Sequence, residues 1–190
     1  MTRIAICGGI GSGKSAVTKI LRDLGAKVVV ADEVNALLMR DIEYIHEVRH
    51  IFPGCVHNNQ INKKELAQLV FADEGKRSAL MTLAHPRIFK KMLTEAEGAE
   101  IAFFEIPLFT MCDVAFDRVW YVAAGVEDRV KAIVRRDGVS EDFARHLISL
   151  QKGEDALSLK ADVVLLNRYD INDLREQVKA QYYSILSDFS

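Results

Sequence analysis

One stretch decides the fold: Gly8-Gly9-Ile10-Gly11-Ser12-Gly13-Lys14-Ser15. It matches the pattern G-x-x-x-x-G-K-[ST] in full, between an apolar run and a segment with apolar residues at helical spacing. Glycines let a backbone curl so that its N–H groups converge on phosphate oxygens, and the start of the following helix adds partial positive charge. The motif predicts a loop for a nucleoside triphosphate, with Lys14 at the β and γ phosphates and the Ser15 hydroxyl on Mg²⁺.

The segments around this loop predict a parallel sheet. Short runs of apolar residues, nearly continuous rather than alternating, are typical of strands covered on both faces. These runs are Arg3–Cys7, Lys27–Ala31, Ile101–Phe104, Val119–Val122 and Asp162–Leu166. Between the first two runs, Val17, Ile20, Leu21 and Leu24 lie at helical spacing, and Gly25 ends that helix. We therefore expect an α/β fold of the P-loop NTPase type with a parallel five-stranded sheet.

Two insertions are expected in this core. No convincing strand is expected from Glu33 to Gly98, and about 65 residues is too long for one crossover, so we predict a helical substrate lobe inserted over the sheet. Its expected helices are Val34–Ile51, Lys63–Val70, Glu74–Ala84 and Pro86–Glu97, with His57–Gln60 as a loop and His85 at a helix start. Val126–Lys160 should form a lid, with Ser140 as a helix N-cap. The predicted divisions are a core of residues 1–31, 99–125 and 161–190, a lobe of 32–98, and a lid of 126–160.

Composition narrows the possible partners. The chain has 190 residues, 49% of them hydrophobic, and a formal net charge of −2. No basic excess exists to neutralise a nucleic-acid backbone, so we expect no nucleic-acid partner. No apolar run is long enough to span a membrane, and no signal peptide is expected. Cys7, Cys55 and Cys112 are scattered, which indicates reduced thiols and a cytoplasmic protein.

The carboxylates that follow the strands bear on the class of P-loop protein. Asn167-Arg168-Tyr169-Asp170 lacks the lysine of a guanine-reading motif, which argues against a GTPase. Asp32 and Glu33 follow the very next strand after the loop, rather than one far downstream as in a mechanical ATPase. The carboxyl end of that strand shares an edge with the loop in a parallel sheet, so Asp32 could meet an acceptor hydroxyl, as in a small-molecule kinase. Spacing alone equally allows Asp32 to be a helix N-cap.

A longer set of ordered motifs is similar to that of the dephospho-coenzyme A kinase family. The likeness runs from Arg3 to about Asp170, and the set is more specific than the glycine loop alone. Its members are Gly8–Ser15, Ala31-Asp32, Phe71–Asp73, Leu83–Ile88, Glu105–Leu108, Arg135–Gly138, Gln151, Ala161-Asp162 and Asn167.

The resemblance implies a reaction and a site. The γ-phosphoryl group of ATP would pass to the ribose 3′-hydroxyl of dephospho-coenzyme A, with Asp32 as base and Lys14 and Arg136 stabilising the transferred charge. The expected substrate-side residues are His85 and Pro107 with Asp32, and Ser15 and Glu105 are the expected Mg²⁺ residues. The expected ATP-binding residues are Gly8, Gly9, Ile10, Gly11, Ser12, Gly13, Lys14, Ser15, Ala16 and Asn167. The alternatives are another nucleoside or nucleotide kinase, or a P-loop ATP-binding protein with weakened transfer activity.

The sequence departs from the family pattern mainly in the lid. Ala132 and Leu157 stand where the family tends to carry basic residues, which reduces the positive charge available to ATP. Of the cationic cluster on the lid helix, we expect Arg136 to close over the phosphates and Arg129, Lys131 and Arg135 to lie on the surface. The other departures are Val30, Ala16 and Met111.

Overall fold

The computed structural model describes residues 1–107, 114–151, 153 and 155–188. These residues form two compact units, one made of Met1–Val29 with Ala96–Ser190 and the other of Val30–Glu95. Leu108, Met111 and Cys112 of the sequence analysis lie outside the described residues. Among the described residues, no helix is long and apolar enough to cross a membrane.

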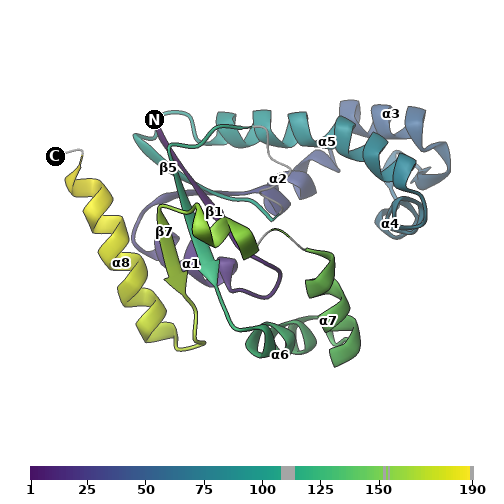
Figure 1. Cartoon of the computed structure of the whole chain (residues 1–190). Coiled ribbons are helices and arrows are strands. Elements are labelled where there is room, and N and C mark those ends of the chain that lie inside the picture. Colours follow the sequence, from purple (N-terminus) through teal and green to yellow (C-terminus); the bar gives the residue numbers. More distant parts are fainter. Residues whose placement is uncertain (108–113, 152, 154, 189–190) are drawn as a thin grey trace. The chain divides into compact units, whose positions relative to one another are not determined.

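The first unit is built on the predicted five-stranded sheet. The sheet has the order β2-β5-β1-β6-β7, which makes β1 the central strand (Figure 1). Its pairs β1–β5, β1–β6 and β6–β7 are parallel. The strands are β1 (Thr2–Cys7), β2 (Lys27–Val30), β5 (Ile101–Glu105), β6 (Arg118–Ala123) and β7 (Val163–Leu166). The fold class predicted from the sequence is therefore confirmed, with strand ends within one residue of those expected.

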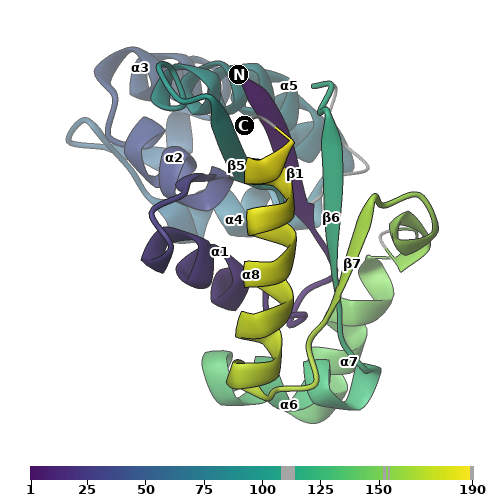
Figure 2. The same ribbon diagram turned by 90° about the vertical axis from the view of Figure 1, so that its left-hand side faces the viewer.

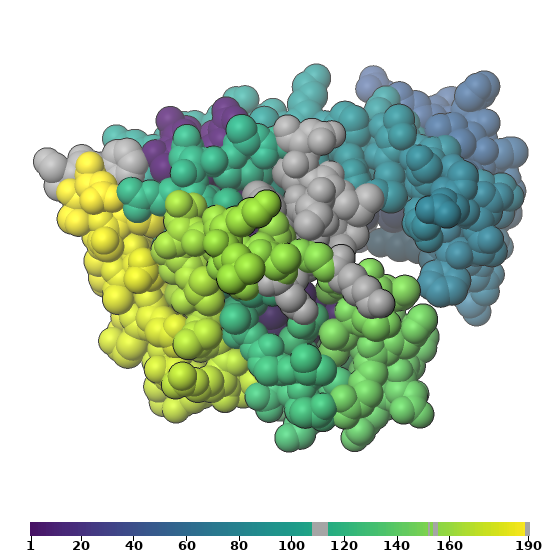
Figure 3. Space-filling view, viewed as in Figure 1, coloured from purple at the N-terminus to yellow at the C-terminus, as the bar shows by residue number. Residues whose placement is uncertain are grey.

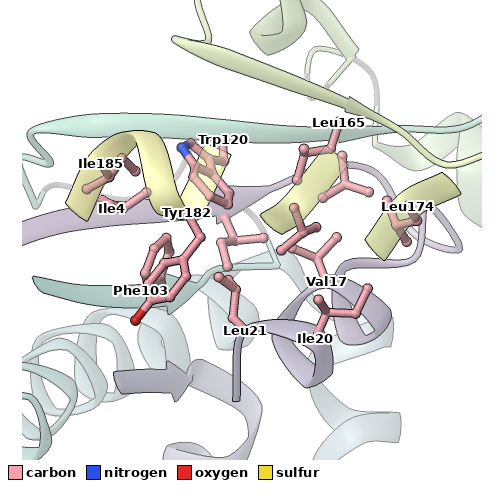
Figure 4. Packing of buried hydrophobic residues seen from close by; sticks show 13 residues of the cluster. Ile4, Val17, Ile20, Leu21, Phe103, Trp120, Leu165, Leu174, Tyr182 and Ile185 are labelled. Atoms are coloured by element: carbon pink, nitrogen blue, oxygen red, sulfur yellow. The ribbon is translucent and has the colours of Figure 1, made fainter. Parts of the chain in front are cut away.

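Two helices supply apolar side chains that cover one face of the sheet. They are α1 (Lys14–Asp23) and α8 (Ile171–Ser187), which lie side by side (Figure 2). The predicted stripe of α1 is buried at Val17, Ile20 and Leu21, and Gly25 adopts a left-handed φ of 84° after the helix. Figure 4 shows these side chains meeting Phe103 and Trp120 of the sheet and Leu174, Tyr182 and Ile185 of α8.

The lid region of the first unit is a helical pair. It consists of α6 (Val126–Asp137) and α7 (Glu141–Leu150), followed by the short helix η3 (Asp155–Leu159). Figure 3 shows α6 and α7 side by side on the surface. Ser140 is the N-cap of α7, as predicted, and its Oγ accepts from the Phe143 N–H at 3.3 Å. Arg145 holds the pair together through two 2.7 Å bonds to Glu127, which lower the pKa of that carboxyl.

The second unit is mostly helical, but it also contains a short hairpin. It contains α2 (Ala31–Leu38), α3 (Ile42–Ile51), η1 (Pro53–Cys55), α4 (Lys63–Ala72) and α5 (Glu74–Glu95). A short hairpin of β3 (Val56–His57) and β4 (Gln60–Ile61) lies where only a loop was expected. Its turn residues Asn58 and Asn59 have φ values of 50° and 59°, which asparagine tolerates better than most residues. Because of this hairpin, the expectation of no strand between Glu33 and Gly98 was wrong.

The helix boundaries of the second unit also differ from the prediction. The expected helix Val34–Ile51 is two helices, because Asp41 caps α3 by accepting from the N–H groups of Glu43 and Tyr44. The expected break before Pro86 is absent, and α5 continues through it. There the Arg87 guanidinium donates to the Leu83 carbonyl and pairs with Glu47. The preference of the residue before a proline for an extended backbone therefore does not end the helix here.

Candidate nucleotide-binding site

The glycine loop leaves the carboxyl end of the central strand. β1 ends at Cys7 and α1 begins at Lys14, so residues 8–13 form the turn between them. Gly8 has a φ of 144°, and a Cβ atom there would lie 2.5 Å from the carbonyl oxygen of Val122 on β6. Only glycine fits this position, because the loop must pass directly against the backbone of the neighbouring strand.

Lys14 folds back over the start of its own loop. Its Nζ donates to the Gly8 carbonyl at 2.7 Å and approaches the Gly9 carbonyl at 3.3 Å. Ser15 follows on an exposed position at the start of α1, where N–H groups without helical partners carry partial positive charge. An ammonium group, a hydroxyl and a helix N-terminus thus lie together beside the loop.

Asn167 holds the far end of the loop. It follows β7, is buried, and donates from Nδ2 to the Ser12 carbonyl at 2.9 Å. Its Oδ1 accepts from the backbone N–H of Tyr169 at 2.9 Å, which fixes the amide orientation. A Cβ atom at Gly13 would lie 2.1 Å from this Nδ2, so the glycine allows the approach. The asparagine therefore supports the loop backbone from a distant part of the chain.

Tyr169 supports the middle of the loop and was not predicted. Its hydroxyl donates to the Gly11 carbonyl. Its own φ of 60° lies in the left-handed region, where a tyrosine is uncommon. Burial raises the pKa of the phenol, and nearby Asp128 adds to the rise, so the hydroxyl keeps the proton that it donates.

Arg129 lies against the loop, and the expectation that it would be a surface residue was wrong. Its side chain is only 3% exposed. Its Nε donates to the Ile10 carbonyl at 2.9 Å, and the Ile10 N–H donates to Oε1 of Gln151 at 2.6 Å. Gln151 was expected only as a member of the family's motif set, without a role. Charge alone suggested a solvated face for Arg129, whereas packing of α6 against the loop buries it.

Arg136, the lid residue that sequence analysis favoured, lies in the last turn of α6 and is exposed. Its guanidinium makes two 2.7 Å bonds to the carboxylate of Asp137, and this pairing lowers the pKa of that carboxyl. The contact is between neighbours in the chain and is open to solvent. A role for Arg136 at the phosphates stays a prediction.

Asp32 lies two residues after β2, and Glu105 is the last residue of β5. Asp32 is exposed and is the second residue of α2, whose N-cap is Val30 and carries no side-chain cap bond. The alternative that Asp32 is an N-cap was therefore wrong. Glu105 is buried at the carboxyl end of β5, where it pairs in register with Ile6 of β1. That register places its backbone one residue before the end of the strand that leads into the glycine loop.

The other two predicted substrate-side residues are in different units. His85 is half-buried inside α5, where its ring meets that of Phe89 edge-on with centroids 6.3 Å apart. Its expected place at a helix start was wrong. Pro107 follows β5 and is half-buried. Among residues 1–107, 114–151 and 155–188, no group of three acidic, histidine or cysteine side chains is arranged to hold a metal ion.

The parallel sheet and the glycine loop at the end of its central strand define a P-loop nucleotide-binding protein with a kinase-type α/β fold. A family model for dephospho-CoA kinase matches residues 2–173. The chain therefore belongs to the dephospho-CoA kinase family, and it is an ATP-dependent kinase.

Individual relatives agree with this assignment. The chain is 32% identical over 187 residues to a dephospho-CoA kinase of Thermus thermophilus, covering 93% of this chain and 88% of the relative. It is 31% identical to one from Geobacillus kaustophilus, covering 98% and 96%. A crystal structure from Thermus thermophilus superimposes with a TM-score of 0.84 at 30% identity, covering 100% of this chain and 98% of that one. The dephospho-CoA kinase structure from Campylobacter jejuni shares the fold, with a TM-score of 0.65 at 24% identity and 97% of each chain covered.

Proposed function

We propose that this protein transfers the γ-phosphoryl group of ATP to the ribose 3′-hydroxyl of dephospho-CoA. Two observations support the proposal: membership of the dephospho-CoA kinase family and a complete glycine loop with Lys14 folded beside it. The glycine loop is the stronger structural support for this reaction, because phosphoryl transfer depends mainly on positioning the phosphates and on stabilising the charge that spreads over their oxygens.

The acceptor side of the proposed reaction rests on Asp32. Its carboxylate is exposed in the first turn of α2 and is not used as a helix cap, so it is available to a ligand. It would accept the proton of the 3′-hydroxyl, or orient that hydroxyl, as the phosphoryl group is transferred. His85 and Pro107 are proposed as contacts to the same substrate.

The ATP side rests on Gly8–Ala16 and Asn167. Lys14 would leave the carbonyl groups of Gly8 and Gly9 to pair with the β and γ phosphates, exchanging neutral acceptors for charged ones. Arg136 would exchange Asp137 for a phosphate in the same way, which an exposed contact permits at small cost.

Mg²⁺ is the proposed cofactor, and the residues present suit it. The Ser15 hydroxyl and the Glu105 carboxylate supply oxygen donors, the kind that this cation prefers. Ser15 is exposed beside the loop, and Glu105 ends the strand next to β1. When bound, Mg²⁺ would neutralise charge that develops on the phosphates.

A coupled assay of ADP release tests the proposal. Dephospho-CoA, its 3′-deoxy analogue, and a panel of nucleosides and nucleotides would each be offered with ATP. We expect turnover with dephospho-CoA and none with the 3′-deoxy analogue, because the accepting hydroxyl is missing. A nucleoside or nucleotide used better than dephospho-CoA would contradict the proposed substrate. Nucleotide binding without turnover on any acceptor would contradict the proposed reaction.

A further inference from the structure

Three carbonyl groups of the glycine loop are held by side chains from distant parts of the chain. Arg129 donates to Ile10, Tyr169 to Gly11 and Asn167 to Ser12. In a trans peptide the carbonyl oxygen and the following N–H point in opposite directions, and the described residues contain no cis peptide bond. Each held carbonyl therefore fixes the direction of the next N–H group. The N–H of Ser12 donates to the Gly9 carbonyl at 3.1 Å, whereas those of Gly11 and Gly13 are the ones that we expect a phosphate to bind.

Within this set, Arg129 controls the peptide between Ile10 and Gly11. Its Nε–H fixes the Ile10 carbonyl at 2.9 Å, and hence turns the Gly11 N–H away from the guanidinium. The fit is close, since a Cβ atom at Gly9 would lie 2.1 Å from an Arg129 guanidinium nitrogen. A Cβ atom at Gly11 would lie 2.8 Å from the Arg129 carbonyl oxygen. Two glycines of the motif thus make room for this residue.

The rest of Ile10 is held by the same helical pair. Its N–H donates to Gln151, which directly follows α7, and its side chain packs on the cluster of Val130, Ile133 and Ala144. The N–H, the carbonyl and the side chain of Ile10 therefore all contact α6, α7 or the residue after them. Among these contacts within the described residues, Arg129 supplies the charge. A charged group is buried at a considerable cost in free energy, so its contacts must be well formed.

We propose that Arg129 is a positioning residue for phosphoryl transfer, which acts through the Ile10 peptide to set the loop N–H groups for the phosphates of ATP. This inference rests on the proposed function for its reaction but concerns nucleotide binding alone.

The test compares variants that keep the bulk of the side chain. Arg129→Met retains the aliphatic stem and removes the guanidinium, and Arg129→Lys retains the charge. Arg135→Met, on an exposed position of the same helix, is the matched control. The dissociation constant of a fluorescent ATP analogue would be measured without acceptor, beside the KM values for both substrates and the melting temperature. The first measurement needs no turnover, so it stands even if dephospho-CoA is not the acceptor.

We expect Arg129→Met to weaken nucleotide binding at least about tenfold, the loss of one hydrogen bond from a charged donor, with the KM for dephospho-CoA within about twofold. Arg129→Lys should recover part of the loss, and Arg135→Met should bind normally. Unchanged binding in folded Arg129→Met would overturn the proposal. So would a lower melting temperature with no change in nucleotide affinity, since that is the result of a purely structural role. If Arg129→Met does not fold, Arg129→Lys and Gln151→Met test the proposal instead, because both change the contacts of the Ile10 peptide. Normal nucleotide affinity in both variants would overturn the proposal.

Discussion

The side-chain amide of Asn167 donates to the carbonyl of Ser12 at 2.9 Å, joining residues 155 positions apart in the chain. The contact is buried, and the other side of the amide is fixed by the N–H of Tyr169. A buried amide with both ends satisfied has one allowed orientation, so it holds the loop in one position. Asn167 was predicted to bind ATP, and its contact with Ser12 provides a way for it to act on ATP through the loop.

Asn167→Asp tests this support at constant size. The substitution replaces the donating nitrogen with an oxygen that faces the Ser12 carbonyl, so one buried hydrogen bond becomes a repulsion. We expect a loss of about 1–3 kcal/mol in the free energy of unfolding and weaker ATP binding. Chemical denaturation and nucleotide titration would measure the two effects. Equal stability and affinity in the variant and the wild type would show that the contact does not support the loop.

Lys14→Ala should abolish phosphoryl transfer, because the developing charge on the phosphates loses its main side-chain counter-ion. The lysine also bonds to Gly8 and Gly9 of the loop, so a change in folding must be separated from a change in chemistry. Lys14→Met keeps the aliphatic stem and is the better variant for that purpose. Single-turnover kinetics with the melting temperature as a control would decide. A folded Lys14→Met variant with near-normal turnover would remove this residue from the mechanism.

The unit of β1, loop and α1 could be predicted from the sequence because its signals are local. A glycine motif and an apolar stripe at helical spacing lie within about 25 residues, the length of a strand–turn–helix unit. Ser140 could be predicted as a cap for the same reason, since it bonds to the N–H three residues ahead. The five strands were visible because parallel strands are apolar throughout.

The side chains that hold the loop could not be predicted in the same way. Arg129 bonds to a residue 119 positions away and Tyr169 to one 158 positions away. Neither belongs to a local pattern, and a buried arginine in a cationic helix looks like its exposed neighbours. The missed hairpin at Val56–Ile61 has strands of two residues each, too short for any alternation of apolar and polar positions.

Asp32→Asn tests the proposed base. The carboxylate would take the proton of the acceptor hydroxyl, so we expect the turnover number to fall by about 10² or more with little change in ATP affinity. A structural role is limited to a favourable interaction with the start of α2, worth about 0.3–1 kcal/mol. Glu33→Gln removes the neighbouring first-turn carboxylate and is the matched control. Equal turnover in the Asp32 variant and this control would contradict a catalytic role.

Tyr169→Phe should change the dependence of stability on pH. The pKa of Tyr169 is raised above the ordinary value of 10.0 by burial, so the folded state holds the proton more tightly than the unfolded chain. Its contribution is fully present below about pH 10 and is lost as the pH rises through the folded pKa. Below pH 10 the variant should be less stable by about 0.5–1.5 kcal/mol, the net worth of one hydrogen bond. Denaturation at pH 8 and above pH 10 should show this difference shrinking, and a constant difference would argue against a titrating hydroxyl.

The lid should respond to added positive charge. The family resemblance leads us to expect basic residues at the positions of Ala132 and Leu157, and Arg136 is exposed beside Asp137. Each new charged contact to phosphate is worth about 1.5–3 kcal/mol at most, so Ala132→Arg or Leu157→Lys should raise kcat/KM for ATP by about threefold or more. The same changes should partly rescue Arg136→Ala, which alone should lose at least about tenfold on the same estimate.

A general effect of net charge must be separated from this local one. Glu141→Gln, on an exposed position at the start of α7, raises the net charge by one without adding a donor. Long-range attraction of ATP falls steeply with salt, so kinetics at two ionic strengths would reveal it. If Arg129 already supplies all the charge that this lid needs, the added residues will have no effect and Arg136→Ala will lose less than about threefold, well below the worth of a charged contact. That result would contradict a charge-poor lid while leaving the role of Arg129 intact, because Arg129 is tested by nucleotide binding and not by the response to new charge.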